Sequence, residues 1–87
     1  MQKIENVLDE RGSKYGRYDY NVNTQVQLML VLEKTPSWHK ADTVTREGVR
    51  MICHKLARAF NGDPSYKDNY IDIAGYAQLI TKFAESQ

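Results

Sequence analysis

Residues 54–77 read HKLARAFNGDPSYKDNYIDIAGYA, and they contain the end of one amphipathic helix, a turn and the first half of another helix. The letters NGDP at 61–64 are strong turn chemistry, because Asn-Gly commonly ends a helix and Pro cannot continue one. Apolar residues recur every three or four positions on both sides of this turn. The stretch therefore predicts an antiparallel helical hairpin, in which residues just before the turn lie near those just after it.

Cations precede the turn and carboxylates follow it. Lys55 and Arg58 are therefore expected within reach of Asp68 and Asp72. Because Asp72 shares a sector of its helix with Tyr76, we predict that its carboxylate is paired and at least partly buried. Two interpretations stay open. The charges form a semi-buried ion pair that only sets the register of the hairpin, or the cations bind the phosphate of a ligand.

Gly75 lies inside the last predicted helix, where glycine costs about 1 kcal/mol relative to alanine. Its presence is best explained by the close approach of another backbone or of a ligand. A bound base would need an aromatic partner, and Tyr15 and Tyr76 are the best candidates for stacking. The full candidate ligand-binding set is Arg11, Tyr15, His54, Lys55, Arg58, Asp68, Asp72 and Tyr76.

Hydrophobic periodicity predicts four helices and no strand along the chain. They cover residues 2–11, 19–34, 44–60 and a last segment that runs to about residue 84. Gly12 is expected to stop the first helix and Thr43 to cap the third. The run LMLVL makes the second helix apolar around much of its circumference. The predicted fold is therefore all-α: one domain over residues 1–87, a small bundle of four helices with a short first helix, completed by assembly into a symmetric homo-oligomer.

Composition narrows the classes of partner. The 87 residues carry twelve Lys plus Arg against eleven Asp plus Glu, a formal charge of +1, so a long nucleic acid is not the expected partner. Cys53 is the only cysteine and is expected to be a buried core residue. No apolar run approaches the length of a membrane span, and the charged start MQKIENVLDERG is unlike a secretory signal. A cytoplasmic protein without a membrane partner is expected.

Motifs for catalysis are missing from the sequence. It contains no nucleophile–base arrangement, no phosphate-binding glycine loop and no His/Cys metal spacing. We therefore predict no catalytic residue, no metal ligand and no cofactor, and favour a binding role over an enzyme.

Two stretches resemble a known family. ERGSKYG at 10–16, together with residues 54–77, resembles a family of small phage and prophage proteins described as a domain of unknown function. The resemblance covers both ends of the chain, while residues 21–42 contribute little. The ending DIAGYA is also similar to the last helix of MazG-like all-α nucleotide pyrophosphatases.

The second resemblance implies a magnesium site, and this chain lacks part of the acidic residues of that site. MazG-like enzymes hold magnesium with two acidic pairs, and the resemblance places Asp68 and Asp72 roughly at the second pair, four residues apart instead of three. The first pair is missing, since the third helix offers only Glu47 and then carries cations. Replacing a carboxylate pair with cations removes metal ligands and leaves groups that bind phosphate directly.

These observations lead to one hypothesis and two alternatives. The hypothesis is a phage accessory protein of the host cytoplasm that binds a nucleotide-like phosphate ligand without turnover and sequesters a cyclic (oligo)nucleotide signal of host antiviral defence. The first alternative is a Mg-dependent nucleotide pyrophosphohydrolase of MazG-like type that uses Asp68, Asp72 and Glu47. The second is a protein-binding module with no small ligand, in which the pairing of cations and acids is only structural.

Overall fold

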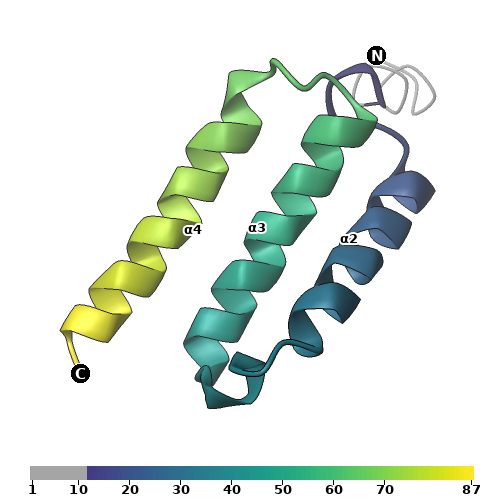
Figure 1. The fold of residues 1–87 in the computed structure, drawn as a ribbon. Helices are drawn as coiled ribbons and strands as arrows, with labels where there is room; N and C mark the ends of the chain where they lie inside the picture. The colour runs from purple at the N-terminus through teal and green to yellow at the C-terminus, as the bar shows by residue number, and fades with distance from the viewer. Residues whose placement is uncertain (1–11) are drawn as a thin grey trace, which may run out of the picture.

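The computed structural model describes residues 12–87, which contain three long helices and no strand. The helices are α2 (Tyr18–Glu33), α3 (Thr43–Asn61) and α4 (Lys67–Glu85), with a short 3-10 helix η1 (Trp38–Lys40) between α2 and α3 (Figure 1). The all-α prediction is confirmed, and the predicted bounds of these helices agree with the observed ones to within about two residues. The predicted first helix, residues 2–11, lies outside the described residues.

Helix α3 is central. Figure 1 shows the three long helices side by side, with α3 between α2 and α4. Gly48 permits the close approach of α4, because a Cβ at this position would lie 2.6 Å from Cδ1 of Ile80. Within residues 12–87 the buried apolar residues are Cys53, Ala57 and Ala59, which all belong to α3. Cys53 is buried as predicted, and this burial raises the pKa of its thiol.

Two predicted helix ends differ from the observed ones. Helix α3 is capped by Asp42, whose carboxylate accepts a hydrogen bond from the Thr45 N–H at 2.7 Å, because Thr43 already has helical backbone. Gly12 does not stop a helix but lies in a helical turn formed by residues 12–15. That turn ends at Gly16, whose φ of +80° is the left-handed conformation that glycine adopts most readily.

Helix α2 has apolar side chains both on its covered side and on its exposed side, as its sequence predicts. Leu30 and Val31 are both exposed, although Leu28, Met29 and Leu32 are partly covered. Assembly into an oligomer stays a prediction at this point. None of the helices in residues 12–87 is long and apolar enough to cross a membrane.

Candidate functional site

Residues 14–16 (KYG), the end of the quoted stretch ERGSKYG, contact the NGDP turn at 61–64 in the structure. A Cβ on Gly16 would lie 2.5 Å from the carbonyl oxygen of Asn61, and a Cβ on Gly62 would lie 2.5 Å from the carbonyl oxygen of Lys14. The Asp63 N–H donates to the same Lys14 carbonyl at 3.1 Å. Backbone therefore lies directly against backbone, and only glycine fits at both positions. This contact places the segment before α2 beside the turn between α3 and α4.

Two asparagines that the sequence reasoning did not single out hold this contact together. The Asn61 Nδ2 donates to Thr24 Oγ1 at 2.9 Å and to the Ala57 carbonyl at 3.1 Å, which ties α3 to α2. The Asn21 Nδ2 donates to the Tyr15 carbonyl at 2.6 Å, and Asn21 is only 6% exposed. Its Oδ1 is buried and has no hydrogen-bond partner in the described part of the chain. The only sequence signal that could have indicated the burial of Asn21 was its position as a polar residue on the apolar side of α2.

A cavity of about 740 Å³ opens beside this contact, between the start of α2 and the last turns of α3. We call it the α2–α3 cavity. Its described lining consists of Gly12, Tyr15, Gly16, Arg17, Tyr18, Asp19, Asn21, Val22, His54 and Arg58. Three of the eight candidate residues are therefore brought together here, namely Tyr15, His54 and Arg58.

Arg58 faces this cavity rather than the acids of α4. Its guanidinium lies 3.8 Å from the centroid of the Tyr15 ring, and its Nε is buried without a hydrogen-bond partner among residues 12–87. The expected pairing with Asp68 or Asp72 is absent. Arg58 follows Lys55 by three residues, so the two side chains leave α3 about 60° apart. Lys55 points toward α4, and Arg58 points toward the start of α2.

The start of α2 brings backbone N–H groups to the cavity. Arg17 occupies the N-cap position without a side-chain capping bond, so the first N–H groups of α2 have no capping side chain. The Arg17 guanidinium instead pairs with the Asp19 carboxylate at 2.9 Å and lies 4.5 Å from the Tyr20 ring centroid. Because Asp19 neutralises Arg17, the feature of the helix start that favours an anion is its uncapped N–H groups.

Lys55 and Asp72 form the predicted pair on the other side of α3. The Lys55 Nζ lies 3.0 Å from the Asp72 carboxylate. The Asp72 side chain is paired and 47% exposed, so it is only partly buried, whereas the side chain of Lys55 is 13% exposed. The long lysine stem is buried between the helices and carries its charge out to an acid at the surface.

The remaining candidate residues lie elsewhere. Hydrogen bonding with Tyr15 and then with Asp68 raises the pKa of Tyr66 to about 12, which places Asp68 beside Tyr66 rather than beside Lys55. Tyr76 lines a shallow hollow of about 530 Å³ on α4 together with Asp72 and Gly75. Arg11 lies outside the described residues.

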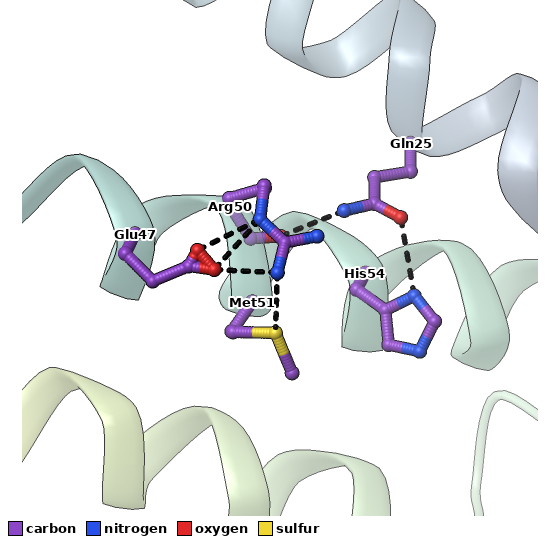
Figure 2. Close-up of polar contacts among 5 residues, drawn as sticks. All are labelled: Gln25, Glu47, Arg50, Met51 and His54. Carbon is purple, nitrogen blue, oxygen red and sulfur yellow. Dashed lines mark hydrogen bonds and ion pairs between the residues drawn. The ribbon is translucent and has the colours of Figure 1, made fainter.

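His54 is held neutral at the cavity wall. Its Nδ1 lies 3.1 Å from Oε1 of Gln25, and the Gln25 Nε2 donates to the Arg50 carbonyl at 3.2 Å (Figure 2). Because this arrangement leaves Oε1 as an acceptor, the Nδ1 of His54 carries the proton. Burial, followed by the charges of Arg58, Lys55 and Arg50, lowers the pKa of His54. Its Nε2 is therefore an acceptor at neutral pH.

The lowered pKa of His54 predicts an acid-sensitive fold. The unfolded chain takes up a proton near pH 6.5 and the folded chain only at lower pH, so the free energy of unfolding falls as pH drops below about 6.5. Urea denaturation of the wild type at pH 7.5 and 5.5 should show this loss. His54→Gln should lose less stability over the same interval. Equal losses in both proteins would assign the pH dependence to other groups.

The acids of the metal-binding alternative do not converge. Among residues 12–87, no three His, Cys, Asp or Glu side chains lie together as a metal site would require. Glu47 is engaged by the guanidinium of Arg50, with Nε at 2.8 Å from both carboxylate oxygens, and this hydrogen bonding lowers the pKa of Glu47 (Figure 2). Asp72 is paired with Lys55, and Asp68 lies beside Tyr66.

Gly75 has no close neighbour within the described part of the chain, residues 12–87. Nothing lies within 4 Å of the position that its Cβ would take. Gly75→Ala should therefore stabilise the isolated chain by about 0.5–1 kcal/mol, because alanine is the better helix former. Chemical denaturation would measure this gain. A loss of stability would show that another backbone or a ligand packs against Gly75, as the sequence suggested.

Fold and site together define a small all-α protein whose central helix separates a basic, tyrosine-lined cavity from a surface ion pair. The chain belongs to the family described as a domain of unknown function (DUF6378), whose model matches residues 1–84. No curated protein and no solved structure matches the chain.

Proposed function

We propose that this chain binds a nucleotide-like phosphate compound in the α2–α3 cavity and holds it without turnover. The observation that carries the proposal is the guanidinium of Arg58, which stacks on Tyr15 at the cavity wall without any carboxylate of residues 12–87 paired to it. An arginine with free donors in a concave site is suited to a phosphate, because its planar fork matches two phosphate oxygens.

The surroundings of Arg58 favour an anion that carries a flat group. The uncapped start of α2 contributes N–H groups to the same cavity. Tyr15 already carries Arg58 on its ring, so Tyr18, which is exposed at the cavity wall, is the aromatic side chain left to stack on a base. The buried Oδ1 of Asn21 can accept a hydrogen bond from an amino or hydroxyl group. The cavity volume lies in the range of small-molecule sites.

The guanidinium of Arg58 is held in place before a ligand binds, and this preorganisation favours binding. The Arg58 side chain is held by Tyr15, and Tyr15 in turn contacts Tyr66 edge-to-face with ring centroids 5.4 Å apart. A guanidinium that is already held in place loses less rotamer freedom when it binds a ligand. Asp19 is the only carboxylate in the described lining, and it is paired with Arg17. A single paired carboxylate supports a binder rather than a two-acid hydrolase.

The biological setting of the proposal is a phage. The resemblance of ERGSKYG, together with residues 54–77, to small phage proteins supports this setting. In it, a binder without turnover sequesters a nucleotide signal of host antiviral defence, such as a cyclic oligonucleotide.

Thermal unfolding with a panel of ligands tests the proposal. Linear and cyclic nucleotides should raise the Tm, and the matching nucleosides should raise it less. The bound nucleotide should be recovered intact after denaturation, with and without magnesium. Equal shifts for nucleosides and nucleotides would contradict the phosphate site. Magnesium-dependent loss of the nucleotide would contradict a binder without turnover and would support the pyrophosphohydrolase instead.

A further inference from the structure

Gly75 lies in the middle of an exposed face of α4, the helix at the outer edge of the row in Figure 1. The hollow of about 530 Å³ at this glycine is bounded by Ile71 and Leu79, whose side chains are 64% and 60% exposed. The side chain that packs against Gly48 of α3 is that of Ile80, about 140° around the helix from Gly75. We call the exposed surface the Gly75 face: Asp68, Ile71, Asp72, Gly75, Gln78, Leu79 and Lys82.

The residues of the Gly75 face are arranged symmetrically about its glycine. At about 100° per residue, positions four and seven residues before and after Gly75 lie within about 40° of its direction. Ile71 and Leu79 occupy the positions at four, and Asp68 and Lys82 occupy those at seven. The face therefore has glycine at its centre, an aliphatic side chain on each side of it and one charge of each sign at its two ends.

The two end charges are free of ion pairs. Among residues 12–87, the ion pairs are those of Arg17 with Asp19, Arg50 with Glu47 and Lys55 with Asp72, so Asp68 and Lys82 belong to none. The nearest opposite charges along α4, Lys67 and Glu85, lie about 80° from the centre of the face. The acid and the base at the ends of the face are therefore both available to a partner.

We propose that a second copy of this chain packs its own Gly75 face against this one, with the two α4 helices antiparallel. A two-fold axis through the two glycines places each residue opposite the one that is equally far on the other side of Gly75. Ile71 then faces Leu79 of the second copy, and Asp68 faces Lys82 of the second copy. Both contacts occur twice in the dimer, as an isologous interface requires.

The residues at three positions from the glycine also match in this arrangement. Asp72 faces Gln78 of the second copy, and an amide can donate a hydrogen bond to a carboxylate. The Asp72 side chain is 47% exposed, so it can accept this bond while it keeps its pair with Lys55. None of these residues lines the α2–α3 cavity, so the proposal needs no bound nucleotide and leaves the cavity open.

Charge and the glycine itself favour the antiparallel pair. A parallel pair would place Asp68 against Asp68 and Lys82 against Lys82, and like charges repel. Two glycines at the crossing let the helices approach closely, because neither has a side chain there. The stabilisation expected for Gly75→Ala applies to the separate chain, whereas in the dimer the added methyl groups would hold the two helices apart.

Sedimentation equilibrium at about 100 µM protein tests the proposal, and the wild type should have twice the mass of one chain. Leu79→Asp should weaken dimerisation about tenfold or more, because it places a carboxylate against Ile71 of the second copy. Thr81→Asp is the matched control. It adds the same charge at an exposed position of α4, about 120° from the centre of the face, and should leave the dimer intact.

An exchange of charges tests the antiparallel register. Asp68→Lys and Lys82→Asp each place like charges opposite one another, and each alone should weaken dimerisation about threefold or more. The double variant exchanges the two charges and should recover the wild-type affinity. A parallel pair would show no such recovery, because like charges would still face each other.

Three outcomes would overturn the proposal. A monomeric wild type would show that no second copy binds to the Gly75 face at this concentration. A dimer that survives Leu79→Asp would place the interface on another surface. A double variant that is as weak as the single variants would exclude the antiparallel register. Circular dichroism of each variant checks that the helices persist, as expected for substitutions at exposed positions.

Discussion

Gly16→Ala is expected to destabilise the fold by about 3 kcal/mol, the largest effect on stability that we predict for a single substitution. Two costs add. A residue with a Cβ is strained at a φ of +80°, and that Cβ would lie 2.5 Å from the backbone oxygen of Asn61. The neighbouring atoms are backbone and cannot rotate away. The segment before α2 would have to separate from the turn between α3 and α4.

Gly12→Ala is the matched control, because no atom of residues 12–87 lies within 4 Å of the position of its Cβ and its φ is not positive. It should leave stability unchanged or raise it slightly, since residue 12 lies in a helical turn. The midpoint of urea denaturation would be compared for the wild type and the two variants. If both glycine variants unfold at the same midpoint, the contact between residues 16 and 61 does not hold the fold together.

Arg58→Ala is expected to weaken nucleotide binding at least tenfold, or about 1.4 kcal/mol. The substitution removes the guanidinium that stacks on Tyr15, and no other cation of α3 lines the cavity. Arg58→Lys should restore only part of the affinity, because lysine keeps the charge but lacks the planar fork. Isothermal titration with the nucleotide that gives the largest thermal shift would measure both variants.

The controls for this prediction come from the same helix. Lys55→Ala and Arg50→Ala remove cations that pair with Asp72 and Glu47, outside the cavity lining. Both variants should bind the nucleotide with nearly unchanged affinity. If Lys55→Ala lost as much nucleotide affinity as Arg58→Ala, the ligand would bind on the side of α3 that faces α4. Unchanged binding in a folded Arg58→Ala would remove the cavity as the ligand site.

Much of the fold could be predicted because it depends on local chemistry. The periodicity of apolar residues and the NGDP turn are short-range signals, and they predicted α2, α3 and α4 closely. The burial of Cys53 followed from its apolar neighbours. The cap of α3 was misplaced by one residue, since Asp42 and Thr43 are both suitable capping residues and only the backbone distinguishes them.

The candidate site was predicted only in part, because its geometry depends on which helix lies beside each face of α3. Treating the last two helices as an isolated hairpin directed both Lys55 and Arg58 toward α4. The structure places α2 on the other side of α3, and the angular separation of these two residues divides them between the neighbouring helices. Five of the eight candidate residues therefore separate into a cavity set, Tyr15, His54 and Arg58, and a surface pair, Lys55 and Asp72.

The sequence by itself determined the helices, the turn and the chemical types available for a site, since each of these depends on residues within a few positions of one another. Only the tertiary structure decided that Gly16 lies against Asn61, that Asn21 is buried and that Arg58 stacks on Tyr15. The contacts of Gly16 with Asn61 and of Arg58 with Tyr15 join residues 45 and 43 positions apart. A helical period gives the direction of a side chain on its own helix, but the packing of the helices determines what lies in that direction.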